Sequence, residues 1–346
     1  MSLICYLTRV HFADRVLEDA LAEELSRHGI KRPLIVTDNK AADTDGLDRL
    51  LHTLPPSVGY ELHTVDEAVG SADNARHVEA LMLDAECDGI VGFGGMASLD
   101  LARLVGDASL PLLTIPTRTE TIGIGPLGRD AAGPQGHNAR LPSGILCDAT
   151  LTMGASPADT AAGGMDALIH CLECLLSATF NPPADGIALD GLRRAASNLE
   201  AAVQDGTNLA ARRELLAAAL NAGLASEKGF GGIEAASHGL ETVTRSRHGV
   251  LHGALLSEIL TFNSPAVSDR FGLIRSALNL PEGSDPADQL SVLAERVGLP
   301  LRLSEIGIEA DALPVAARRA AEDPANRTNP RHATAQDYER MMRAIL

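Results

Sequence analysis

Residues 89–100 read GIVGFGGMASLD, a short apolar run that passes through a glycine cluster into helix-forming residues. The pattern predicts a buried strand, a tight glycine turn and the start of a helix. Similar apolar runs stand at 34–37 and 112–115. A helical stretch at 16–28 precedes the run at 34–37, and another at 74–85 precedes the run that begins at residue 89. Short buried strands separated by helices are typical of βαβ units, so we expect a parallel sheet in this half of the chain.

The composition changes near residue 156, where alanine-rich stretches with helical periodicity begin. Ser156 followed by Pro157 is a typical helix start, with a serine N-cap and proline at the first helical position. Helices are predicted from there onward, at 156–178, 184–203, 208–226, 230–245, 248–262, 286–297 and 310–322. We therefore predict an α/β domain with a parallel sheet over 1–155 and an all-helical domain over 156–346.

Composition and charge exclude several classes of protein. The 346 residues are 45% hydrophobic, as in a globular protein, and 46 acidic against 29 basic residues give a net charge of −17. Such a charge repels nucleic acid and anionic membranes, so we expect neither as a partner. No apolar run approaches the roughly 18–20 residues of a membrane span, and the N-terminus lacks a signal-peptide core. With five cysteines and no secreted spacing pattern, we expect a cytoplasmic enzyme acting on a small molecule.

The segment GGMDALIHCLE, residues 163–173, contains an acidic residue and a histidine one helical turn apart. Asp166 and His170 are separated by four residues and therefore lie on the same helix face, where a plain surface contact is the alternative to a metal site. The flanking residues are apolar, and an unpaired carboxylate would be costly to bury among them. Imidazoles from His238 and His252 would complete a ligand set suited to Fe²⁺ or Zn²⁺.

Four motifs of the chain resemble those of a known family. Residues 164–173 match the helix motif G-x-D-A-x-x-H-x-x-E of the iron-containing (group III) alcohol dehydrogenases. His238 and His252 match a histidine that is followed fourteen residues later by His-Gly. Residues 260–266 resemble L-x-F-N-x-P, and residues 323–331 resemble D-x-x-x-x-x-N-P-R. The chain is thus similar to a family that also includes maleylacetate reductases and glycerol dehydrogenases.

The resemblance implies a fold and a set of metal ligands. The fold is that of the dehydroquinate synthase-like proteins, with a Rossmann-like α/β domain and an all-α domain. The implied ligands of Fe²⁺ or Zn²⁺ are Asp166, His170, His238 and His252, and His248 is an alternative to His252. The resemblance also implies a homodimer.

The strand ends of the α/β domain indicate where a dinucleotide binds. The glycine turn after residue 93 resembles G-G-G-S-x-x-D-x-x-K and opens a helix, whose N-terminus favours a pyrophosphate. Residues 116–123 resemble P-T-T-x-G-T-G-S-E. Asp38 directly follows the strand at 34–37, where its carboxylate could bind the adenosine ribose and repel the extra phosphate of NADP, which favours NAD. The expected cofactor-binding residues are Asp38, Gly94, Gly95, Met96, Ala97, Asp100, Thr117, Thr121 and Leu151.

The implied reaction is the NAD-dependent oxidation of an alcohol, or the reduction of an aldehyde or ketone. A divalent ion would stabilise the alkoxide, and hydride transfer would take place in the cleft between the domains. A histidine that the family often places four residues after the third ligand is absent, because that position is Thr242. We therefore expect His248, or Thr242 through water, to carry the proton step.

Three alternatives remain open at this point. The first is a maleylacetate reductase, whose helix motif usually reads G-M-N-A, whereas this chain has Asp166 at the third position. The second is a sugar-phosphate cyclase of the same fold, which would need clustered cations although the chain has only three lysines, Lys31, Lys40 and Lys228. The third is a non-catalytic relative, suggested by the altered loops at 94–97 and 117–121.

Overall fold

The computed structural model describes residues 8–65, 71–106, 109–124, 140–244 and 246–346. The chain divides into two compact units, an α/β unit that ends at Ala155 and a helical unit that begins at Ser156. A short exception is the segment 119–121, which belongs to the helical unit although it lies in the first half of the sequence.

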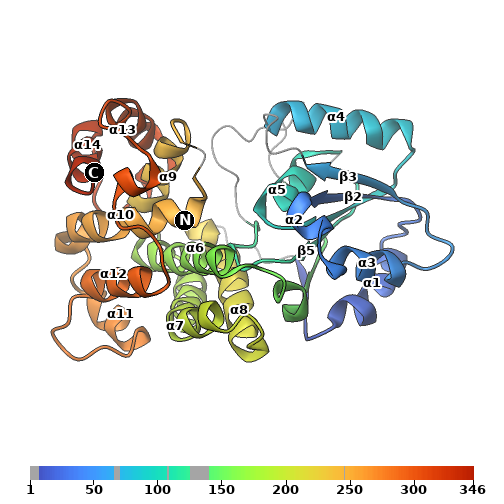
Figure 1. Cartoon of the computed structure of the whole chain (residues 1–346), viewed down its shortest axis with the longest axis horizontal. Coiled ribbons are helices and arrows are strands. Elements are labelled where there is room, and N and C mark those ends of the chain that lie inside the picture. Colours follow the sequence, from blue (N-terminus) through green and yellow to red (C-terminus); the bar gives the residue numbers. More distant parts are fainter. Residues whose placement is uncertain (1–7, 66–70, 107–108, 125–139, 245) are drawn as a thin grey trace. The chain divides into compact units, whose positions relative to one another are not determined.

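The α/β unit is built on one parallel sheet, which confirms the prediction from the apolar runs. Its strands lie in the order β1-β6-β5-β4-β2-β3, and all paired neighbours run in the same direction (Figure 1). The strands are β1 (Arg9–Phe12), β2 (Pro33–Asp38), β3 (Glu61–Val65), β4 (Gly89–Gly94), β5 (Leu112–Pro116) and β6 (Gly144–Cys147).

Helices cover both faces of this sheet, which explains why its central strands are continuously apolar. Ile35 and Val91 face one layer of helices, whereas Leu34, Val36 and Ile90 face the other. The first layer contains α1 (Val16–Arg27) and α3 (Asp45–Thr53), and the second contains α4 (Ser71–Asp84) and α5 (Met96–Leu104) (Figure 1). Successive residues of a strand point to opposite faces, so each strand contributes to two apolar cores.

The carboxyl ends of three adjacent strands bring distant parts of the sequence together. Gly94 at the end of β4 is in register with Pro116 at the end of β5, and Phe93 pairs with Thr37 of β2. Asp38 is the last residue of β2 and the N-cap of the short helix α2 (Asn39–Ala42). Ligands of parallel α/β sheets bind at this edge.

The helical unit has α6 (Pro157–Leu176) at its centre. Every residue of α6 from Thr160 onward is buried, and α7, α8, α9 and α10 pack against it. Its N-cap is Ser156, whose side chain accepts a hydrogen bond from the backbone of Asp159, as predicted for this helix start. The other helices are α7 (Pro182–Gln204), α8 (Leu209–Ala225), α9 (Gly232–Glu241), α10 (His248–Asn263), α11 (Phe271–Ala277), α12 (Pro286–Arg296), α13 (Leu313–Glu322) and α14 (Ala335–Ala344).

Close approach of α10 to α6 depends on Gly249. A Cβ atom at this position would overlap the carbonyl oxygen of Ala162, so only glycine lets the first turn of α10 lie against α6. Within the described ranges, no helix is both long and apolar enough to cross a membrane.

Candidate active site

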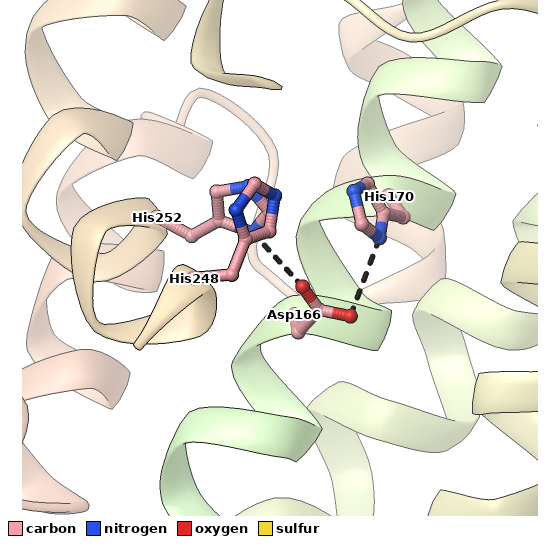
Figure 2. A group of neighbouring side chains, drawn as sticks. All are labelled: Asp166, His170, His248 and His252. Atoms are coloured by element: carbon pink, nitrogen blue, oxygen red, sulfur yellow. Dashed lines mark ion pairs between the residues drawn. The ribbon is translucent and has the colours of Figure 1, made fainter. Parts of the chain in front are cut away.

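Three helices of the helical unit each present two potential metal ligands one turn apart. Helix α6 carries Asp166 and His170, α10 carries His248 and His252, and α9 carries Glu234 and His238. Residues four apart lie on one face of a helix, so each pair points to the same side. Figure 2 shows the two pairs of α6 and α10 facing each other.

Four of these side chains form a compact buried group. One potential ligand atom from each of Asp166, His170, His248 and His252 lies within 4.8 Å of the other three. Asp166 Oδ2 is 3.3 Å from His170 Nδ1, and Asp166 Oδ1 is 3.7 Å from His252 Nδ1 (Figure 2). The sequence predicted three members of this group as ligands and His248 as the alternative.

Glu234 lies among the imidazoles of this group and was not predicted. Its Oε2 atom is 2.9 Å from His170 Nε2, 2.6 Å from His248 Nε2 and 3.2 Å from His252 Nε2. Asp166 faces the Nδ1 atoms of His170 and His252, whereas Glu234 faces the Nε2 atoms of the same two rings. The Asp166 group and Glu234 therefore form one cluster of two carboxylates and three imidazoles, named here the five-residue cluster.

A signal for Glu234 was present in the sequence. The spacing of fourteen residues to a His-Gly pair separates His238 from His252, but it also separates Glu234 from His248 and Gly249. The first spacing has a histidine at both ends and therefore predicts two imidazole ligands, whereas the second begins with a glutamate. When the spacing is counted from Glu234, the position four residues later is a histidine, His238. When it is counted from His238, that position is Thr242.

Two residues outside the cluster, Thr121 and Glu241, orient its side chains. Thr121 donates its backbone N–H to Asp166 Oδ2 at 2.8 Å, and its hydroxyl lies 2.6 Å from His170 Nδ1. His248 Nδ1 lies 2.6 Å from Glu241 Oε1. Such partners fix the ring orientation and the tautomer of a metal-binding histidine. Thr121, predicted to bind the cofactor, thus contacts the predicted metal ligands.

His238 occupies a different position from the one predicted. Its Nε2 lies 3.2 Å from Glu234 Oε1, its Nδ1 lies 2.9 Å from Asp323 Oδ2, and its side chain is 27% exposed. It groups with Glu234 and His248 rather than with the α6 pair. Thr242 is exposed at the end of α9, and its hydroxyl donates to the carbonyl oxygen of Gly239 at 2.7 Å. Among the described contacts, Thr242 has none with the cluster, because it caps α9 beyond the turn that carries His238.

Charges within the cluster are strongly coupled. Burial alone would raise the pKa of Glu234, but His248, His170 and His238 hold it well below its usual value. Burial would lower the pKa of His170, but Asp166 and Glu234 raise it to about 10. Burial and the neighbouring His248 lower the pKa of His252 to about 4, so His252 is neutral at pH 7. The cluster therefore binds protons where a cation would bind, and metal binding would release them.

Two buried atoms support a cation at this position. Asp166 Oδ1 and His252 Nδ1 are buried without a hydrogen-bond partner. Buried polar atoms are normally satisfied, and a positive ion would satisfy a carboxylate oxygen and a neutral imidazole nitrogen together. Carboxylate and imidazole donors suit Fe²⁺ and Zn²⁺, so the residues present fit a divalent ion.

The predicted nucleotide residues gather at the carboxyl edge of the sheet, apart from Thr121 and Leu151. Asp38 ends β2, Gly94 ends β4 with a φ of +144°, and Gly95 is the N-cap of α5. Thr117 donates its N–H to the carbonyl of Gly94 at 2.9 Å. The remaining residues lie on α5 or in the core: Met96, Ala97 and Asp100 on α5, and Leu151 in the apolar core of the unit.

Comparison with known proteins gives a consistent result for both units. Residues 8–120 match the iron-containing alcohol dehydrogenase family, and residues 160–346 match the C-terminal domain of the Fe-containing alcohol dehydrogenase family. The chain is 33% identical to a 4-hydroxybutyrate dehydrogenase from Cupriavidus necator over 99% of both chains. It is 28% identical to a 1,3-propanediol dehydrogenase from Klebsiella pneumoniae over 91% of both chains.

Solved structures show the same relationship. A crystal structure of a 1,3-propanediol oxidoreductase superposes with a TM-score of 0.89 at 26% identity and covers 100% of both chains. These findings confirm the predicted family, fold and reaction class. The chain belongs to the iron-containing alcohol dehydrogenase family and is a metal- and nicotinamide-dependent oxidoreductase acting on CH–OH groups.

Proposed function

We propose that this enzyme interconverts a short ω-hydroxycarboxylate and its semialdehyde, and that the five-residue cluster holds the ion required. The geometry of the cluster is the observation that carries the reaction, because two carboxylates and three imidazoles contact one another within the helical unit and four of them meet the distances of a metal site. The substrate class is supported by the 33% identity to 4-hydroxybutyrate dehydrogenase over nearly the whole of both chains. In the oxidation, the hydroxyl-bearing carbon loses a hydride to the nicotinamide, and the hydroxyl loses a proton.

The proposed ligands are Asp166, His170, His248 and His252, with Glu234 as a fifth donor. This set replaces His238 of the sequence-based prediction by His248 and adds Glu234. The ion would act as a Lewis acid toward the hydroxyl oxygen. A second carboxylate makes the donor set harder, so we propose Fe²⁺ in preference to Zn²⁺.

His238 is the residue that we propose for the proton step. It is hydrogen-bonded to Glu234 on one side and to Asp323 on the other, and it is partly exposed. It can therefore pass a proton from the cluster toward solvent. His248 also lies between two carboxylates, Glu234 and Glu241, but its side chain is only 7% exposed, so it suits a ligand better than a carrier of protons to solvent.

We further propose that the enzyme is a cytoplasmic homodimer, on the sequence arguments given above.

A substrate panel tests the proposed function. The chelated enzyme is reloaded with Fe²⁺ or Zn²⁺, and kcat/KM is measured for 4-hydroxybutyrate, 1,3-propanediol and ethanol with NAD⁺ and NADP⁺. Reduction of maleylacetate is measured with and without metal. We expect the highest kcat/KM with 4-hydroxybutyrate and loss of activity after chelation. A tenfold preference for 1,3-propanediol would contradict the substrate class, and metal-independent reduction of maleylacetate would favour that alternative.

A further inference from the structure

Both oxygen atoms of the Asp38 carboxylate accept hydrogen bonds from donors of the protein itself. Oδ1 accepts the backbone N–H of Ala41 at 3.0 Å and a guanidinium N–H of Arg118. Oδ2 accepts the backbone N–H of Gly95 at 2.8 Å and lies 3.2 Å from the hydroxyl oxygen of Ser98, whose single proton also reaches the Gly95 carbonyl oxygen at 2.9 Å. An ionised carboxylate has about four lone-pair sites, and N–H donors of the protein take three of them, which leaves at most the site beside Ser98 for a ribose hydroxyl.

The Asp38 carboxylate is also buried and paired with a cation. Asp38 is 1% exposed, and the side chain of Arg118, which forms an ion pair with it, is 11% exposed. We expected Asp38 to bind the adenosine ribose and to repel the extra phosphate of NADP, and both effects require a free carboxylate whose charge is not compensated. In this chain the carboxylate is neither free nor uncompensated.

Sheet order explains how Arg118 reaches Asp38 across 80 residues of sequence. Strand β4 lies between β5 and β2, and Arg118 follows β5 by two residues, whereas Asp38 ends β2. The ion pair therefore spans the end of β4, where the chain turns at Gly94. A Cβ atom at Gly94 would overlap the carboxylate of Asp38, so glycine is required to let the carboxylate lie over this turn.

We propose that the Asp38–Arg118 ion pair determines cofactor selectivity, and that by neutralising Asp38 it lets the enzyme bind NADPH nearly as well as NADH. The inference rests on the proposed function, in which a nicotinamide dinucleotide binds at this edge of the sheet. Arginine is also the residue that accommodates a 2′-phosphate in dinucleotide-binding domains. Loss of Arg118 would leave Asp38 with its negative charge and one free acceptor, which is the arrangement that selects NAD.

Direct binding measurements test this proposal without depending on turnover. The dissociation constants of NADH and NADPH are measured by fluorescence titration for the wild type, Arg118→Gln, Arg118→Lys and Arg32→Gln. Arg32 makes an ion pair with Glu61 beside the amino end of β2, so its variant makes the same charge change at the opposite edge of the sheet. Thermal melting by circular dichroism verifies that each variant is folded.

We expect the wild type to bind the two cofactors within about tenfold of each other. Arg118→Gln should increase the ratio of Kd for NADPH to Kd for NADH by roughly 10- to 100-fold, because an uncompensated charge then faces the phosphate. Arg118→Lys keeps the charge and should keep the ratio within about threefold, as should Arg32→Gln. If Arg118→Gln does not fold, the wild-type ratio decides, and a preference for NADH above a hundredfold overturns the proposal.

Two further outcomes separate this inference from the proposed function. An unchanged ratio in folded Arg118→Gln would overturn the role of the ion pair alone. Failure of the wild type to bind either dinucleotide would overturn the proposed function, and this inference with it.

Discussion

Glu234 Oε2 lies 2.6 Å from His248 Nε2, closer than it lies to either of the other two imidazoles around it. The contact joins α9 to the first residue of α10, and His248 Nδ1 is held in turn by Glu241. A buried carboxylate is stable only where charge and hydrogen bonds compensate it. Among the described contacts of its carboxylate, Glu234 receives that compensation from imidazoles.

Removing the charge of Glu234 should weaken metal binding. In Glu234→Gln the amide keeps the shape of the side chain but is a poor ligand, so we expect the affinity for Fe²⁺ to fall at least roughly tenfold. The measurement is iron per chain, by elemental analysis after dialysis against graded chelator. Glu241→Gln is the control, because Glu241 contacts only the outer nitrogen of His248, and its loss should be smaller. Full iron occupancy in Glu234→Gln would contradict the proposed donor.

We expect His238 to be needed for proton transfer and His248 to be needed for metal binding. We expect His238→Gln to retain its metal and to lower kcat by roughly 10²-fold, the usual contribution of a positioned proton carrier. His248→Gln should lose most of its metal, because it removes a proposed ligand. Metal content and kcat are measured on both variants. The reverse pattern, with metal lost from His238→Gln and kept in His248→Gln, would restore the ligand set predicted from the sequence.

Two glycines of α10 give a matched test of helix packing. Gly249→Ala places a Cβ atom against the Ala162 carbonyl, so α10 must move away from α6 and separate His252 from Asp166. We expect a loss of about 1–3 kcal/mol in the free energy of unfolding, together with loss of metal. At Gly253 the nearest atom would be 3.4 Å away, on Leu299, an ordinary contact.

Gly253→Ala should therefore be neutral or stabilising by up to about 1 kcal/mol, since alanine favours helix formation. Chemical denaturation and metal analysis measure both variants. Equal stability of the two would show that α10 does not depend on close contact at Gly249.

Glu24 in the α/β unit should make stability depend on pH. It is fully buried, and its carboxylate contacts Arg9, His11, Arg27 and His28 at 3.0–3.4 Å. Burial would raise the pKa of Glu24, but His11 and Arg9 outweigh it and lower the pKa below its usual value. A lowered folded-state pKa stabilises the protein above the unfolded pKa of about 4.5, and this stabilisation is lost as the pH falls through the folded value.

Glu24→Gln should accordingly reduce the free energy of unfolding by about 1–3 kcal/mol at pH 7, with the difference narrowing below pH 4.5. Urea denaturation between pH 3 and 7 measures this dependence. Glu23→Gln is the control, because Glu23 is 63% exposed and pairs only at the surface with Arg27. A constant difference between wild type and Glu24→Gln at all pH values would contradict the argument.

The two-unit organisation, the parallel sheet and the Asp166–His170 pair were predictable from the sequence. Each of these depends on short-range pattern: apolar runs that are buried on both faces of a sheet, a serine–proline helix start, and a spacing of four that places two side chains on one helix face. Such patterns are complete within a few residues, so no knowledge of the rest of the chain is needed to interpret them.

The residues of α9 and α10 that lie against this pair depend on how the helices pack, which the local sequence pattern does not specify. Glu234 and His238 lie on one face of α9, and His248 and His252 lie on one face of α10, so a shift of one turn gives an equally reasonable ligand set from sequence alone. The close contact at Gly249 fixes the turn of α10 that faces α6. Likewise, Arg118 pairs with Asp38 because β4 lies between β5 and β2, a neighbourhood set by strand order rather than by distance along the chain.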